Sequence, residues 1–388
     1  VEQATEQANT MVAQADAQTT EMVNDHEIMQ RAYAHANEVV EQANIQAQAI
    51  VDAAVNDANN IRQGAIQYTD DMLRGIYAAH PDMVKYVEDD LRCYCTAKKK
   101  QGKVAIITGG GTGHLPLFLG YVGENLLDGC GVGGVFQSPS SEQIYNVAKE
   151  VEAGAGVLFL YGNYTGDIMN FDMAAEMLDM DDIRTTSIVG ADDVLSNKDA
   201  QVRRGVAGIF FMYKCAGAMA ARMGTLEEVL DAAKKAKENT RTVGFALTPC
   251  VIPEIGHSNF TLAEDEMAFG MGIHGEPGVW NGPVKTANDL AEESVGEILG
   301  DMPLNPGEEV CLLINGLGAT SQEELYILSG SVHRILEEKG IKVYRTFVGE
   351  YATSMEMAGA SISICRMADQ EMKQWIDMPV HTPFYTQV

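Results

Sequence analysis

Apolar side chains recur at helical spacing through the first part of the chain. From residue 29 to residue 65 they follow one another at steps of three and four, with a mean step near the helical period of about 3.6 residues. Residues 1–66 contain no Pro and no Lys, and no Gly before Gly64. The pattern predicts one long amphipathic helix over residues 1–66. The recurring residues are Met29, Ala32, Ala36, Val40, Ala43, Ala47, Ile50, Ala54, Ala58, Ile61 and Ala65.

The apolar stripe of this predicted helix is thin, because most of it is alanine. Alanine favours helix but contributes little buried area, and a long helix alone in water is marginally stable. We therefore expect the helix to pair with a copy of itself, with a partner, or with the rest of the chain. A regulatory or localising coil fits this sequence, and so does a plain helical extension or fusion segment.

From Tyr68 onwards the chain alternates between strand-like and helix-like patterns. Thr69 stands where it could cap a short helix that ends near His80. Short apolar runs then alternate with helical patterns, which is typical of a parallel sheet with helices on both faces. We predict a first α/β domain over residues 67–240. Its strands are expected at 103–108, 157–161 and 185–189, and its helices at 141–148, 174–178, 209–223 and 226–238.

A second α/β domain is predicted over residues 241–388. The predicted fold is therefore α/β, with two domains of mostly parallel or mixed sheets flanked by helices, preceded by the long N-terminal helix. The strands of the second domain are expected at 241–247, 309–314 and 342–347, and its helices at 323–338 and 369–375.

The charge balance disfavours anionic partners. The formal net charge is -28, from 55 acidic and 27 basic residues, whereas nucleic-acid binders need clustered Lys and Arg. The compact basic run of residues 98–100 with Lys103 is interpreted as a solvated loop rather than a binding patch. No apolar run reaches the ~18 residues of a membrane span, and the first residues do not resemble a secretory signal. We predict a cytoplasmic protein that binds neither membrane nor nucleic acid.

The seven cysteines are scattered and odd in number. Cys93 and Cys95 form a C-x-C pair, but no second pair lies near them to complete a zinc site. We predict no metal site, and free thiols in a reducing compartment. The other five are Cys130, Cys215, Cys250, Cys311 and Cys365.

The first candidate for chemistry is a glycine-rich loop, GGGTGH over residues 109–114, that directly follows a predicted strand. Glycines let the backbone approach a ligand and point N–H groups at it, although a tight turn without a ligand would look the same. The loop lacks the Lys of a Walker A motif. Asp128 stands at about the right distance for a dinucleotide site, but in a stretch that does not look like a strand end. We predict no nucleotide site on this chain.

Two further loops carry candidate residues. Asp167, in NYTGD after another predicted strand, could act as a general base or merely cap a helix. His274 lies in the glycine-rich segment GMGIHGEPG, where a neutral imidazole could project into a cleft and add to a ketone. A structural or simply exposed histidine is the alternative.

These three segments, in this order and at this spacing, resemble the substrate-binding subunit of dihydroxyacetone kinase. The resemblance covers about residues 68–388 and leaves the N-terminal helix outside. It implies that His274 captures the ketone carbon as a hemiaminal and that Asp167 takes a proton from the attacking primary hydroxyl. It also implies that His114 hydrogen-bonds the substrate and assists proton transfer. The loop backbone at Gly111, Thr112 and Gly113 would hold substrate hydroxyls. Further matching segments are RRGVAG at 203–208, TLAE at 261–264, NGLGAT at 315–320 and HTP at 381–383.

The resemblance also implies partners. A separate subunit would carry the nucleotide with magnesium, as ATP or as ADP recharged by a phosphotransferase-system donor, and this chain would bind no cofactor itself. A homodimer is expected on the same ground. The substrate would be dihydroxyacetone or a related ketose.

Two positions depart from the family pattern. Leu115 replaces the usual acidic residue after the loop histidine, and Gly162 replaces a substrate-binding Lys. Losing that Lys removes a charged donor and makes room, so a larger ketose such as erythrulose is a reasonable hypothesis. Two other functions remain open: a ketose-sensing coactivator of a transcription regulator without kinase activity, and a scaffold driven by the helix.

Overall fold

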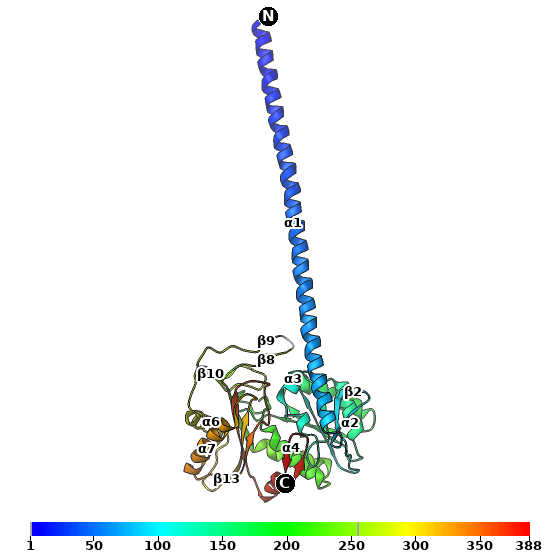
Figure 1. Cartoon of the computed structure of the whole chain (residues 1–388), viewed down its shortest axis with the longest axis vertical. Coiled ribbons are helices and arrows are strands. Elements are labelled where there is room, and N and C mark those ends of the chain that lie inside the picture. The colour runs from blue at the N-terminus through cyan, green and yellow to red at the C-terminus, as the bar shows by residue number, and fades with distance from the viewer. Residues whose placement is uncertain (1, 254–255) are drawn as a thin grey trace. The chain divides into compact units, whose positions relative to one another are not determined.

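The structure is a computed structural model that describes residues 2–253 and 256–388. The chain divides into two units, Val1–Ile61 and Arg62–Val388, which are described separately. The first unit is part of helix α1 (Glu2–Ala79), and its side chains from Thr5 to Ile61 are all exposed. Helix α1 is labelled in Figure 1.

Helix α1 is longer than the sequence pattern predicted. We expected a break near residue 66 and a new helix capped by Thr69, and this was wrong. The helix runs without interruption to Ala79, and Thr69 is buried inside it. Because residues 66–79 contain no Pro, propagation of the existing helix wins over the start of a new one.

The second unit contains a first six-stranded sheet. Strands β3, β4, β5 and β6 run parallel, and β1 and β2 add an antiparallel edge. The predicted strands at 103–108, 157–161 and 185–189 correspond to β3, β5 and β6. The order across the sheet is β1 (Val84–Val87), β2 (Asp90–Thr96), β4 (Gly129–Val132), β3 (Ala105–Gly110), β5 (Val157–Gly162) and β6 (Thr185–Gly190).

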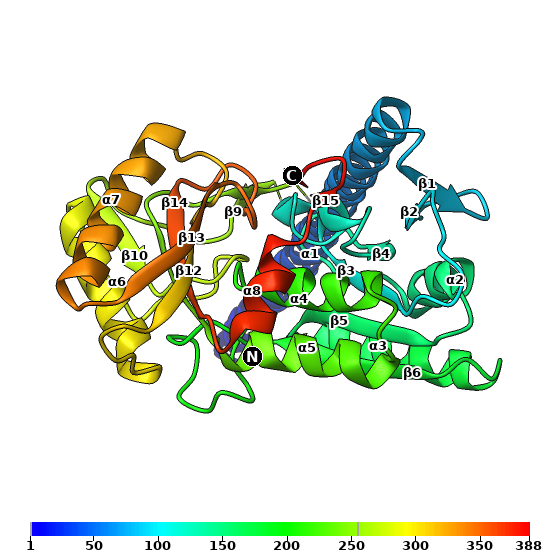
Figure 2. The same ribbon diagram turned by 90° about the horizontal axis from the view of Figure 1, so that it is seen from below.

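Helices cover both faces of this sheet, as predicted. Helices α2 (Ser141–Val151) and α3 (Thr165–Asp179) pack on one face, and α4 (Ile209–Ala221) and α5 (Leu226–Glu238) pack on the other. Helix α4 is apolar on nearly all sides, as expected of a helix enclosed by other elements. Figure 2 shows α4 and α5 beside the strands of this sheet.

A second six-stranded sheet follows from Thr240 onwards. Strands β12 and β13 are parallel, whereas the other pairings are antiparallel. One face is covered by α6 (Ala287–Asp301) and α7 (Gln322–Glu338), and the other meets α4, where the rings of Phe210 and Phe347 are 5.1 Å apart. The order is β11 (Trp280–Pro283), β10 (Glu266–Phe269), β7 (Thr240–Ala246), β14 (Gly359–Arg366), β12 (Glu309–Gly316) and β13 (Lys342–Gly349). The predicted α/β fold with two helix-flanked sheets is confirmed.

The last residues return from the second sheet to helix α4. Helix α8 (Gln370–Asp377) packs against α4 (Figure 2) and is followed by the small hairpin β15 (Val380–His381) and β16 (Thr386–Gln387). Inside α4, the ammonium of Lys214 donates to the carbonyl oxygen of Met378 at 2.8 Å, and burial lowers the pKa of Lys214 to about 7. The boundary predicted near residue 240 thus lies between the two sheets, while the tail joins the helices of the first.

The cysteines and the hydropathy of the helices fit the sequence predictions. All seven cysteines are free and buried. Among the described residues, every helix is too short or too polar to cross a membrane. Short elements complete the chain: η1 (Thr112–His114), η2 (Leu119–Tyr121), β8 (Val251–Ile252) and β9 (His257–Ser258).

Candidate active site

The glycine-rich loop and the NYTGD loop lie side by side, because they follow the neighbouring parallel strands β3 and β5. Ligand sites in such sheets form beyond the carboxyl ends of the strands. Gly111 stands at the turn after β3, where a Cβ atom would lie 2.3 Å from the carbonyl oxygen of Val135. Only glycine lets this loop approach the segment after β4 so closely.

His114 is fully buried in η1 at the end of the glycine-rich loop. Its Nδ1 is 2.8 Å from the carbonyl oxygen of Thr353, so Nδ1 carries the proton and donates it. Its Nε2 has no hydrogen-bond partner. Burial, followed by the proximity of His274, lowers the pKa of His114 to about 3. The ring is therefore neutral near pH 7 and presents a free acceptor.

Asp167 lies in the first turn of α3, beyond the end of β5. The helix N-cap is Tyr164, so Asp167 does not serve as the cap. Its side chain is 6% exposed, and Oδ1 has no partner. Burial raises the pKa of Asp167 to about 6, against the opposing effects of a hydrogen bond with Ser138 and the charge of His274. A carboxylate of this kind can accept a proton near neutral pH.

His274 reaches the same place from the second sheet, on the loop after β10. Its ring centroid lies 4.5 Å from that of His114, with the rings nearly perpendicular. Its Nδ1 is 2.9 Å from Oε1 of Glu276, and its backbone N–H donates to Oε2 at 3.0 Å. A proton on Nδ1 satisfies the carboxylate and leaves a lone pair on Nε2.

Glu276 is a residue of the cavity that the sequence analysis did not single out. Burial opposes its ionisation, but its hydrogen bond with His274 and the charges of His274 and Arg204 hold the pKa of Glu276 at about 2. Arg204 is itself held by Asp193, which accepts from Arg204 Nε at 2.9 Å. A Cβ atom at Gly272 would lie 2.2 Å from Glu276, so glycine is needed here. The sequence did contain one indication of its role, because Glu276 stands only two residues after His274.

Two of the three predicted catalytic residues line a cavity of about 300 Å³, and the third is buried beside it. His274 and Asp167 line it, and His114 contacts both His274 and Phe136, another lining residue. Of the predicted loop contacts, Gly111 lines this cavity, whereas Thr112 and Gly113 line a neighbouring pocket. The lining residues are Gly110, Gly111, Phe118, Phe136, Gln137, Ser138, Tyr164, Asp167, Ile252, His274 and Glu276.

Gly162 ends β5 and lies next to Tyr164, a residue that lines the cavity. A Cβ atom at Gly162 would lie 2.9 Å from the ring of Tyr164, so that ring already occupies the space beside it. Tyr164 also stacks edge-on against His274, with centroids 4.6 Å apart, and donates from its hydroxyl to the carbonyl oxygen of Gly205. Tyr164, which belongs to the NYTGD segment, thus forms the wall of the cavity next to Gly162.

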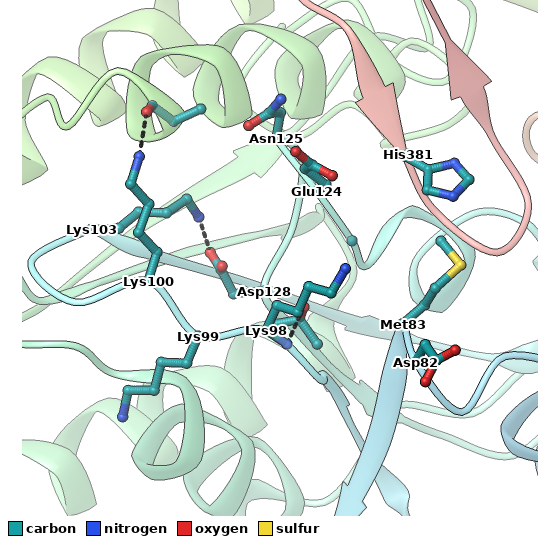
Figure 3. Close-up of a pocket in the computed structure, with 13 residues that line it drawn as sticks. Asp82, Met83, Lys98, Lys99, Lys100, Lys103, Glu124, Asn125, Asp128 and His381 are labelled. Atoms are coloured by element: carbon teal, nitrogen blue, oxygen red, sulfur yellow. Dashed lines mark hydrogen bonds and ion pairs between the residues drawn. The ribbon is translucent and has the colours of Figure 1, made fainter.

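A larger cavity of about 410 Å³ lies at the amino ends of β3 and β4. Figure 3 shows Lys103 directed to Asp128 and Lys100 directed to a backbone carbonyl oxygen. Lys103 forms an ion pair with Asp128, while Lys99 and Lys100 donate to backbone carbonyl oxygens. The side chains of residues 98–100 are exposed, as expected of a solvated loop. The prediction was wrong for Lys103, which is buried.

Fold and cavity together define a two-sheet α/β protein whose loops hold a buried carboxylate and two facing histidines. Residues 74–384 match the Dak1 domain family, and the chain belongs to that family. The dihydroxyacetone-binding subunit DhaK of PTS-dependent dihydroxyacetone kinase 2 from Listeria innocua is 43% identical over 314 residues, covering 81% of this chain and 95% of that protein. A D-erythrulose kinase from Mycolicibacterium smegmatis is 41% identical over 288 residues, covering 74% of this chain and 50% of that protein.

A solved structure has the same fold. The dihydroxyacetone kinase operon co-activator Dha-DhaQ superposes with a TM-score of 0.77 at 31% identity, over 82% of this chain and 98% of that one. The family match begins at residue 74, so residues 1–73 lie outside it.

Proposed function

We propose that this chain is the substrate-binding subunit of a ketose kinase of the dihydroxyacetone type. The observation that carries the proposal is that His274 and Asp167 line one cavity, with His114 packed against His274 beside it. Family membership and the 43% identity to a dihydroxyacetone-binding subunit support it. The substrate would be recognised by its ketone and phosphorylated on a primary hydroxyl.

His274 would capture the ketone as a hemiaminal. The Nε2 lone pair forms a bond to the carbonyl carbon, and the C=O π pair moves to the oxygen. The oxygen takes a proton from water, while Nδ1 releases its own proton by way of Glu276 to water, so protons and charge balance. The position of Glu276 against Nδ1 supports this assignment. Polyols such as glycerol have no carbonyl group and would be rejected by the chemistry itself.

Asp167 would take the proton of the primary hydroxyl as that oxygen attacks phosphorus. Its raised pKa supports the role, because the ionised form is then a competent base near neutral pH. Neutral His114 would accept a hydrogen bond from a substrate hydroxyl through its free Nε2. Both atoms lack a partner within the chain, and a bound ketose would supply one.

The phosphoryl group would come from a separate subunit that holds ATP, or ADP recharged by a phosphotransferase-system donor, with magnesium. The relative from Listeria innocua is described as PTS-dependent, which favours the second donor. A homodimer and a cytoplasmic location stay predictions of the sequence analysis.

Reconstituted phosphoryl transfer tests the proposal. The chain is mixed with a nucleotide-bearing subunit, magnesium and either donor, and offered dihydroxyacetone, both erythruloses and glycerol. We expect ketose phosphate from the native chain, little from His274→Ala and none from glycerol. Because Tyr164 fills the space beside Gly162, greater turnover of erythrulose than of dihydroxyacetone would have to arise elsewhere in the cavity.

A second candidate function is a ketose-sensing coactivator without kinase activity. The similarity to the co-activator Dha-DhaQ, which extends over 98% of that chain, supports this second function. Ketose binding that requires His274, with no product from any nucleotide-bearing partner, would support this function against the kinase.

A further inference from the structure

The exposed stripe of helix α1 repeats every eleven residues between residues 28 and 61. Ile28, Val39, Ile50 and Ile61 are spaced by eleven, and Met29 begins a second such series. Three repeats have the form apolar, apolar, x, x, Ala, variable, x, x, Ala, x, x. They are IMQRAYAHANE at 28–38, VVEQANIQAQA at 39–49 and IVDAAVNDANN at 50–60.

An eleven-residue repeat fills three helical turns at about 3.67 residues each, so it stays on one face when helices wind with a right-handed twist. The five repeating positions span roughly 130° of the helix surface at that pitch. All five charged residues between 28 and 61 lie off the stripe, and Asn44 is the one polar residue on it. The charged residues are Arg31, Glu38, Glu41, Asp52 and Asp57.

The middle of the stripe is lined by small side chains. Ala36, Ala47 and Ala58 follow its central line at eleven-residue spacing, and larger apolar residues such as Ile50 and Tyr33 form its borders. A second helix can approach the alanines closely and pack its own borders against these larger residues. Ile50 is 70% exposed and Tyr33 is 65% exposed, so this apolar surface is in water in the isolated chain.

A partner helix keeps contact along the stripe only if its own apolar pattern has the same pitch. The segment itself has that pitch, and it carries no charge on the contact face. We propose that residues 28–61 form a right-handed coiled coil with the same segment of a second copy of this chain. This segment precedes the region matched by the family, so the inference does not depend on the proposed function.

Disulfide trapping in the full-length chain tests the pairing. Ala47 lies on the middle of the three central positions, so it meets its counterpart whether the helices run parallel or antiparallel. Ala49 lies on the opposite face and provides a matched control. With oxidised glutathione, we expect Ala47→Cys to form a linked dimer at least about tenfold faster than Ala49→Cys. Equal rates would overturn the proposal; the seven native cysteines are buried, and the unchanged chain sets the background.

Charge placed on the stripe provides a second measurement. Ala36→Glu with Ala58→Glu introduces carboxylates into the contact line, whereas Ala34→Glu with Ala53→Glu places them on the far face. In the Ala47→Cys background, we expect the stripe pair to slow disulfide formation roughly tenfold, with the far-face pair leaving it unchanged. An equal effect of both pairs would contradict a defined contact face.

Discussion

The first sheet has a cavity at the carboxyl ends of its strands and another at the amino ends. The two cavities differ in whether their polar side chains already have partners within the chain. The larger one, of about 410 Å³, contains lysines that are already engaged by Asp128 and by backbone carbonyl oxygens. The smaller one, of about 300 Å³, has beside it two buried polar atoms without partners, on His114 and Asp167. Because an unpaired buried polar atom is costly, it marks a ligand site better than volume does.

The largest expected effect comes from removing the proposed nucleophile of the smaller cavity. His274→Ala should lower kcat/KM for ketose phosphorylation by at least about 10,000-fold, because alanine cannot form the covalent adduct. The measurement is steady-state turnover with a nucleotide-bearing subunit. Turnover above a tenth of the native rate would remove the covalent step from the proposal.

Asp167→Asn should lower kcat by about 1,000-fold while ketose capture persists, because the amide cannot accept the hydroxyl proton. Native kcat should rise with pH as Asp167 ionises near pH 6 and then level off. Turnover across pH 5–8 checks both statements. An unchanged pH profile in Asp167→Asn would exclude this carboxylate as the base.

Glu276→Gln should lower kcat/KM by about tenfold to a hundredfold, because the imidazole of His274 loses the carboxylate that fixes its tautomer. Its effect should appear in ketose capture, followed by the carbonyl carbon signal of labelled ketose in NMR. Glu276→Asp should recover part of the loss. Equal losses in both variants, with capture intact, would mean that Glu276 only supports the loop.

Individual strands show how much of the fold could be predicted from the sequence. The strands β3, β5 and β6 were predictable because each is a short run of apolar residues next to glycine. Strand β14 was missed because Gly, Ser and Cys dilute its β-branched residues, and it becomes a strand by pairing with β7 and β12 on both sides. Whether such a segment forms a strand depends on the strands that pair with it rather than on its own composition.

The residues of the candidate site also divide into those that the sequence indicates and those that only the folded chain reveals. His114, Asp167 and His274 could be singled out from loops rich in glycine after strands. Glu276 and Tyr164 could not, because their roles depend on which side of the backbone they face once the two sheets meet. The surroundings of Gly162 were also not predictable from the sequence, because the ring beside it belongs to a side chain two residues away.

Stability should respond to Asp167 in the direction opposite to activity. The folded chain raises the pKa of Asp167 from 3.8 to about 6, so the folded state holds its proton where the unfolded state has lost it. Stability therefore falls as pH rises between these values and stays low above them. At pH 7, Asp167→Asn should raise the free energy of unfolding by about 3 kcal/mol, with the gain vanishing below about pH 4. Urea titrations at both pH values check this; equal differences would contradict the raised pKa.

The smallest expected change in activity lies at the larger cavity. Lys103→Met should destabilise the fold by about 3 kcal/mol, because it leaves the largely buried carboxylate of Asp128 without its charge partner and with only the backbone N–H of Ile106. Kcat/KM should stay within about twofold at temperatures where the variant is folded, and Lys98→Ala should change neither quantity. A loss of turnover in Lys98→Ala, with stability unchanged, would give this cavity a functional role.

The return of the tail to helix α4 has a consequence for biosynthesis. Lys214 is buried, and the carbonyl that it binds belongs to Met378, which the ribosome adds 164 residues later. While the chain is being made, Lys214 and the aromatic residues around it have no cover from residues 370–388. The helices that pack on the first sheet therefore cannot complete their layer during early translation, although that sheet is made first. The nascent chain has to keep this surface from aggregating until the second sheet and the tail have been synthesised.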